Sequence, residues 1–123
     1  MHVTSERFEE LVAEAIDGLP EWVLARLENV VVLAAPWATP AQAQAARTGA
    51  GKTILGLYEG VPLTRRGRAY SMRPPDRITL FHLALEQMAT SEQALKRTIQ
   101  RTIVHEIGHH FGFDEEQIRG LGY

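Results

Sequence analysis

The stretch HEIGHHFGFDEE, from His105 to Glu116, contains the pattern His-Glu-x-x-His, and the rest of the chain can be interpreted around it. On an α-helix, residues four apart differ by about 40° in direction and about 6 Å in rise, so His105 and His109 point from one face. Two imidazoles at this spacing can bind one metal ion, and neutral imidazole is a favoured ligand of Zn²⁺. Glu106 lies one step round the helix, where it could take a proton from a metal-activated water. The pattern therefore predicts a hydrolytic zinc site with Glu106 as its catalytic base.

Three neighbouring features favour this interpretation. An apolar run precedes the motif, Gly112 follows it, and acidic residues lie directly beyond that glycine. Glycine readily adopts the left-handed conformation that ends a helix and redirects the chain, so a downstream carboxylate could return to the metal. The competing interpretation is a solvated helix face or a set of buried histidines, because His-Glu-x-x-His also occurs by chance. The combination is more specific than the five-residue pattern alone.

With these flanking residues, HEIGHHFG followed by a short acidic segment resembles the small bacterial zincin-like metallopeptidases, sometimes called minimal zincins. They are related to the Asp-zincins, whose pattern is HExxHxxGxxD. LGLYEG (55–60) and PDRITLF (75–81) also resemble that family, so the likeness covers roughly the second half of the chain. The resemblance implies a compact zincin domain with a catalytic zinc. It also implies a peptide substrate that lies along an edge strand, around residues 55–61.

The third metal ligand is expected from the turn after the motif. The final Asp of the family pattern falls at Glu115 in this sequence, and Asp114 lies one place earlier. We favour Glu115 as the ligand, with Asp114 second and Glu116 third. Asp114 also has a structural alternative, because it can cap a short helix that begins at Glu115, with Gln117 as its capping-box partner.

Other residues of the motif region have less specific roles. His110 faces about 100° away from the preceding histidine and is expected to support a ligand or to pack against a neighbour instead of binding metal. Gly108 lies within the motif helix, where it either allows a neighbouring backbone to approach or is simply a tolerated glycine. Tyr58, Tyr70 and Tyr123 could each stabilise a reaction oxyanion, and the sequence does not select one of them.

Length and composition limit the class of protein. With 123 residues, 45% of them hydrophobic and 23% charged, the chain fits one globular domain over residues 1–123. The sequence has no cysteine, so disulfides and thiolate metal sites are excluded and zinc would need His and carboxylate ligands. Neither a signal-like leader nor a run of about 18 apolar residues occurs. We therefore expect a cytoplasmic protein that does not insert into membranes.

Charge is distributed unevenly along the chain. The formal net charge is -2, but residues 1–30 hold seven acidic and two basic residues, whereas residues 47–77 hold seven basic and two acidic residues. Five arginines form the densest part of the basic segment: Arg65, Arg66, Arg68, Arg73 and Arg77. The segment is either a solvated loop or a patch for an acidic peptide or protein. Nucleic acid is the least favoured partner, since no overall basic field would attract it.

Three segments have the composition of β-strands. Val30–Ala34 is an uninterrupted apolar run rich in β-branched residues, which is typical of a strand buried inside a sheet. Residues 54–59 are largely apolar and end at a glycine, and Arg77–Phe81 places Ile78 and Leu80 on one face. We therefore expect a small mixed sheet with Val30–Ala34 in its interior.

Two segments have strong helical periodicity. Between residues 8 and 19, apolar side chains recur at helical spacing with acidic residues on the other side. The motif helix carries an apolar stripe formed by Leu95, Ile99, Ile103 and Ile107. Thr90 and Gln93 have the spacing of a capping box that would start this helix. Residues 36–52 are expected to form a connection, with a short helix after Thr39.

Together these features predict a single-domain, zincin-like α+β fold in which a small mixed sheet packs on the active-site helix. The predicted function is zinc-dependent peptide-bond hydrolysis, with His105, His109 and a carboxylate near position 115 as ligands of Zn²⁺. Glu106 would act as general base and then as proton donor to the leaving amine. The competing function is a non-catalytic, metal-binding protein of the zincin fold that engages a protein partner. Glu106 favours the enzyme, because a structural metal site needs no general base.

Overall fold

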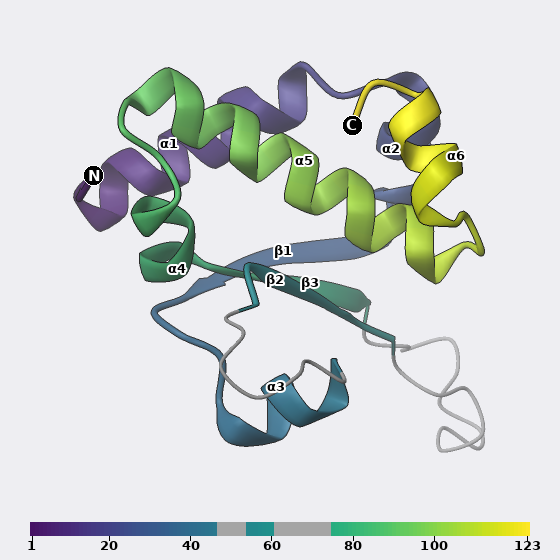
Figure 1. Cartoon of the computed structure of the whole chain (residues 1–123), viewed down its shortest axis with the longest axis horizontal. Helices are drawn as coiled ribbons and strands as arrows, with labels where there is room; N and C mark the ends of the chain where they lie inside the picture. Colours follow the sequence, from purple (N-terminus) through teal and green to yellow (C-terminus); the bar gives the residue numbers. More distant parts are fainter. Residues whose placement is uncertain (47–53, 61–74) are drawn as a thin grey trace.

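The computed structural model describes residues 1–46, 54–60 and 75–123, which form six helices and one three-stranded sheet (Figure 1). In chain order the elements are α1 (Ser5–Asp17), α2 (Glu21–Arg26), β1 (Val30–Ala35), α3 (Pro40–Ala45), β2 (Gly56–Glu59), β3 (Asp76–Phe81), α4 (His82–Gln87), α5 (Glu92–His110) and α6 (Glu115–Gly120). The predictions for Tyr70 and for Arg65, Arg66, Arg68 and Arg73 lie outside the described residues. The expected α+β class, with a small mixed sheet packed on the motif helix, is confirmed.

The sheet has the strand order β1-β3-β2, with β1 parallel and β2 antiparallel to β3. The prediction that Val30–Ala34 lies inside the sheet is wrong, because β3 occupies the centre and β1 an edge. Val31 and Leu33 of β1 are 40% and 45% exposed, whereas Ile78 and Leu80 of β3 are fully buried. An apolar run is compatible with a central strand and with an edge strand. Here β3 is central because it pairs with β1 on one side and with β2 on the other.

Helices α1 and α5 lie side by side across one face of the sheet (Figure 1). The predicted stripe of α5 is fully buried, and it packs in the main core with Phe8, Leu11 and Ala15 of α1. Helix α5 begins one residue later than predicted. Its N-cap is Ser91, whose side chain accepts a hydrogen bond from the Ala94 N–H, so Thr90 is not the cap. The short helix after Thr39 is confirmed as α3.

Gly56 lets the motif helix approach the edge of the sheet. A Cβ atom at this position would lie 2.7 Å from Cγ2 of Thr102 on α5 and 3.2 Å from the main-chain oxygen of Thr79 on β3. Real Cβ atoms do not make such short contacts, so any larger residue would push β2 and α5 apart. The glycine therefore brings the C-terminal half of α5, which carries the motif, against β2.

Among the described residues, no helix is long and apolar enough to cross a membrane.

Candidate metal centre

Three side chains of the predicted site converge at the C-terminal end of α5. Oε1 of Glu115 lies 3.3 Å from Nδ1 of His105 and 3.0 Å from Nε2 of His109. One donor atom from each residue lies within 4.8 Å of the others, and this is the one such group of His, Asp and Glu found in the described part of the chain. Zinc bonds of about 2.0–2.1 Å in a tetrahedron place donor atoms roughly 3.3 Å apart. The donor types and the two nitrogen-to-oxygen distances therefore fit Zn²⁺.

The end of α5 returns the chain to these histidines. Gly112 has a φ of 91°, which confirms the predicted left-handed conformation. The Phe113 N–H donates to the oxygen of Gly108 at 2.8 Å, and the Gly112 N–H donates to the oxygen of His109 at 3.1 Å. This pair of bonds is the Schellman pattern that closes many helices. No atom lies within 4 Å of the position of a Cβ at Gly112, so backbone conformation and not packing requires the glycine.

Helix α6 then packs on α5 at Gly108. A Cβ atom at Gly108 would lie 2.8 Å from Cδ1 and 3.1 Å from Cγ1 of Ile118, which is fully buried. The close neighbour of Gly108 is therefore the Ile118 side chain, and not the main chain that one of its two alternative roles required. This contact fixes the first turn of α6, which carries Glu115, beside the two histidines.

Asp114 has the structural role predicted as its alternative. Its Oδ1 accepts from the Gln117 N–H at 2.8 Å, and Oε1 of Gln117 accepts from the Asp114 N–H at 2.8 Å. This capping box satisfies main-chain donors at the start of α6. Asp114 and Glu116 do not belong to the converging group, whereas Glu115 does.

Glu106 points toward the edge strand β2. The Tyr58 N–H donates to Oε1 of Glu106 at 2.9 Å. Burial raises the pKa of Glu106 above its ordinary value, although the Tyr58 N–H and the nearby His109 and His105 act in the opposite direction. A carboxylate with a raised pKa accepts a proton more readily near neutral pH than an exposed one does. The environment of Glu106 is therefore that of a candidate general base.

Tyr58 connects β2 to two further side chains. Its ring stacks on His110 with centroids 3.8 Å apart and an interplanar angle of 22°, which confirms the expected packing role of His110. Its hydroxyl donates to Oδ2 of Asp76 at 2.7 Å. These contacts hold the Tyr58 main chain beside Glu106. The sequence singled out Tyr58 for its hydroxyl, but the group that reaches the site is its amide.

Tyr123 also reaches the site through its main chain. Its main-chain oxygen lies 2.8 Å from Nε2 of His105, the nitrogen that faces away from Glu115. The sequence pointed only to the phenol of Tyr123, and this main-chain contact was not predicted. Gly122, placed just after a short predicted helix, is the signal that could have indicated a second chain reversal.

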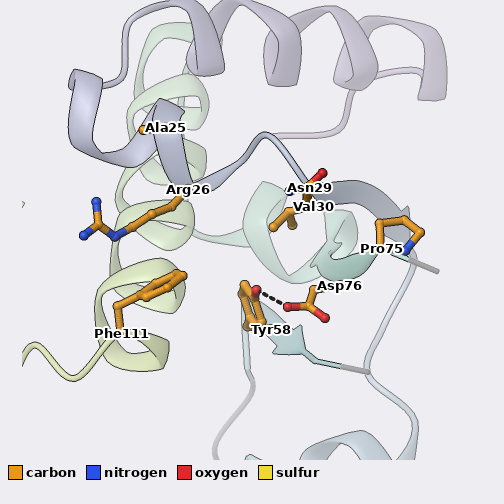
Figure 2. Close-up of a pocket in the computed structure, with 8 residues that line it drawn as sticks. All are labelled: Ala25, Arg26, Asn29, Val30, Tyr58, Pro75, Asp76 and Phe111. Atoms are coloured by element: carbon orange, nitrogen blue, oxygen red, sulfur yellow. Dashed lines mark hydrogen bonds between the residues drawn. The ribbon is translucent and has the colours of Figure 1, made fainter. Parts of the chain in front are cut away.

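A cleft of about 630 Å³ lies beside Tyr58 (Figure 2). It is lined by Ala25, Arg26, Asn29, Val30, Tyr58, Pro75, Asp76 and Phe111. The guanidinium carbon of Arg26 lies 5.0 Å from the centre of the Phe111 ring, and Nη1 of Arg26 donates to the oxygen of Trp22. None of the three converging side chains lines this cleft. It adjoins the candidate metal centre through Tyr58 and through Phe111 at the end of α5.

The geometry agrees with a comparison to known protein families. The family described as zincin-like metallopeptidase matches residues 27–123, a span that includes the whole sheet, α5 and α6. No curated protein matches the sequence significantly. The match covers well over half of the 123 residues and contains every member of the converging group. The chain therefore belongs to the zincin-like metallopeptidase family.

Proposed function

We propose that this protein is a zinc-dependent peptidase in which His105, His109 and Glu115 bind Zn²⁺ and Glu106 is the general base. The observation that carries this proposal is the convergence of two imidazoles and one carboxylate within 4.8 Å, beside the half-buried carboxyl group of Glu106. Membership of the zincin-like metallopeptidase family supports it. A structural zinc site has no use for a half-buried carboxylate that is not a ligand, because partial removal from water costs free energy.

The chemistry divides between the metal and the chain. When bound, zinc would supply a Lewis acid that polarises the substrate carbonyl and makes a water molecule more acidic. Glu106 would accept one proton from the attacking water and deliver it to the nitrogen of the scissile peptide bond. The bond between the carbonyl carbon and that nitrogen then breaks, which leaves a carboxylic acid and an amine.

The described contacts suit Glu106 to this shuttle. The Tyr58 amide binds Oε1, and within the described residues no hydrogen bond engages Oε2, which is left for the proton. Because a main-chain amide on a paired strand cannot rotate as a side chain does, it fixes the orientation of the carboxylate. The stack between Tyr58 and His110 further restrains Tyr58.

We further propose that the substrate is a peptide that lies along β2. Phe81 donates its N–H to the oxygen of Leu55, and main-chain groups alternate along an antiparallel pair. Main-chain groups of Gly56 and Tyr58 therefore point away from β3, and the Tyr58 N–H on this side is the one that binds Glu106. Addition of an extended peptide to a sheet edge is a common mode of recognition. The sheet edge at β2 would align the scissile bond with Glu106.

A cytoplasmic location remains part of this proposal, since a chain without cysteine has no need of an oxidising compartment.

The decisive experiment compares the wild type with Glu106→Gln, which keeps the size of the side chain and removes its basicity. Each zinc-loaded protein is incubated with a mixed peptide library, and cleavage is read by mass spectrometry. We expect turnover to fall by roughly 10²- to 10⁴-fold in the variant, with bound zinc unchanged. Glu116→Gln is the matched control, because Glu116 is exposed and lies outside the converging group.

Three results would contradict the proposal. Equal cleavage by the wild type and Glu106→Gln would remove the role of Glu106. Failure of the wild type to bind about one zinc per chain would remove the metal site. Zinc binding without any cleavage would favour a non-catalytic protein that uses the same fold to engage a partner.

A further inference from the structure

We propose that two copies of this chain pair through the outer edge of β1 and form a two-fold symmetric dimer. The two sheets would then join into one sheet of six strands, in the order β2-β3-β1-β1-β3-β2. The proposal does not depend on the zinc site, and it leaves the edge of β2 open for a peptide.

The outer edge of β1 carries main-chain groups that are available for pairing. β1 pairs with β3 residue by residue from Val30 to Ala35, so its other side is an edge of the sheet. Such an edge presents a row of N–H and C=O groups without strand partners. Within the described residues, Val31–Ala35 make no main-chain hydrogen bond beyond those of the sheet. Another extended strand can satisfy these groups.

The side chains along this edge are apolar. Val30 and Val32 pack against the main core on the side of the helices, whereas Val31 and Leu33 lie on the opposite face and are 40% and 45% exposed. A groove of about 410 Å³ between β1 and α1 has a mainly apolar lining, and its charged member, Glu9, is exposed and can remain in water. A second strand beside β1 would therefore bury apolar surface on both faces of the sheet.

β1 lacks the features by which sheet edges usually avoid pairing. Exposed edges are commonly protected by a lysine, a proline, an inward-pointing charge or a β-bulge. The sequence of β1 is VVVLAA, without a charged residue or a proline, and its register with β3 is unbroken, without a bulge. The edge of β2 differs, because Glu59 lies in that strand and the Glu106 carboxylate binds the Tyr58 amide. Of the two edges, β1 is therefore the one suited to stable pairing with another chain.

The distribution of charge near β1 favours a second copy as its partner. Antiparallel pairing about a two-fold axis at Val32 would place Val31 opposite Leu33 of the second copy, so apolar side chains would face one another. Glu28, the nearest acidic residue before the strand, would lie opposite Pro36. The two Glu28 residues would then be roughly 27 Å apart along the strands, at about 3.4 Å per residue. Since this separation exceeds the Debye length of about 8 Å, the two copies would not repel each other at these residues.

The test measures the molar mass in solution of the full chain and of charged variants, by light scattering after size-exclusion chromatography. The wild type should have about twice the chain mass of 13.7 kDa. In the proposed pairing, position 31 of each copy is a diagonal neighbour of the other at about 7–8 Å, so Val31→Lys places two like charges within one Debye length. We expect the dissociation constant of the dimer to rise by about 100-fold or more. Met88→Lys is the matched control, because Met88 is 65% exposed and lies outside β1.

A mixing experiment separates loss of pairing from loss of folding. Val31→Glu should dissociate the dimer as Val31→Lys does, for the same reason. An equal mixture of the two variants should regain the dimer mass, because a lysine then meets a glutamate across the two-fold axis. Loss of folding in either variant would not be corrected by mixing, and circular dichroism of each variant checks the fold directly.

Three results would overturn the proposal. The first is a wild type with the mass of a single chain from micromolar to millimolar concentrations. The second is a dimer that persists unchanged in Val31→Lys, which would place the interface elsewhere. The third is absence of recovery in the mixture although both variants are folded. None of these results bears on zinc binding or peptide cleavage, which are measured separately.

Discussion

The choice of Glu115 over Asp114 as the third ligand predicts opposite behaviour of two neighbouring alanine variants. Asp114 makes both bonds of the capping box at the start of α6, so Asp114→Ala should cost about 1 kcal/mol of folding stability. Glu115 is 52% exposed, so in metal-free protein Glu115→Ala should change stability by no more than about 0.5 kcal/mol. Added zinc should reverse the order of the two variants, because Glu115→Ala would lose most of the stabilisation that zinc gives to the wild type and to Asp114→Ala.

Expected shifts in melting temperature follow from the size of the chain. An unfolding entropy of about 2.1 cal/mol/K per residue gives roughly 0.26 kcal/mol/K for 123 residues, so 1 kcal/mol corresponds to about 4 °C. Zinc at about 100 times its dissociation constant should stabilise the wild type by about 2.7 kcal/mol, or roughly 10 °C. If loss of a ligand weakens binding by about 100-fold, the same zinc concentration stabilises Glu115→Ala by only about 0.4 kcal/mol, or roughly 2 °C.

The assay is thermal unfolding followed by circular dichroism, with chelator and with added zinc. In chelator, Asp114→Ala should melt about 4 °C below the wild type and Glu115→Ala within about 2 °C of it. With zinc, Asp114→Ala should keep most of the wild-type gain and Glu115→Ala should lose most of it. The opposite pattern, a retained zinc effect in Glu115→Ala and a lost one in Asp114→Ala, would refute the reasoning and assign Asp114 as the ligand.

Three further predictions test the surroundings of the site. Because burial raises the pKa of Glu106, ionisation of this group in zinc-free protein destabilises the fold as pH rises through the raised pKa. Glu106→Gln should therefore be more stable than the wild type near neutral pH, and the difference should close below about pH 4, as denaturant titrations in chelator would show. Gly56→Ala should cost about 1–3 kcal/mol, since its Cβ would collide with Thr102, and it should also lower activity by moving Tyr58. Gly112→Ala should cost about 1–2 kcal/mol through its positive φ, measured by thermal unfolding.

Gly120→Ala is the common control for both glycine substitutions, because a Cβ there meets no atom within 4 Å and its φ is not positive. A cost at Gly56 or Gly112 no larger than at Gly120 would contradict the steric or conformational argument at that position. A wild type that is more stable than Glu106→Gln in chelator at neutral pH would contradict the argument from burial.

Local patterns in the sequence determined the parts of this protein that depend on nearby residues. The four-residue spacing placed His105 and His109 on one helix face, because helical geometry repeats regardless of the rest of the fold. Gly112 indicated the reversal after the motif, and Asp114 with Gln117 indicated the start of α6, since these signals act within a few residues. The apolar stripe of α5 likewise predicted its buried face.

Strand order and the identity of distant neighbours were decided by the tertiary structure. The apolar run of β1 did not show that β3 would be the central strand, because apolar runs occur in central strands and in partly covered edge strands alike. Residues 48 apart in sequence meet where the Tyr58 amide binds Glu106, and residues 18 apart meet where the Tyr123 oxygen binds His105. Both contacts use main-chain groups, which every residue except proline carries in full, so no side-chain pattern can indicate them. They exist because α5, α6 and β2 pack closely at glycines, and packing over such distances depends on the whole core.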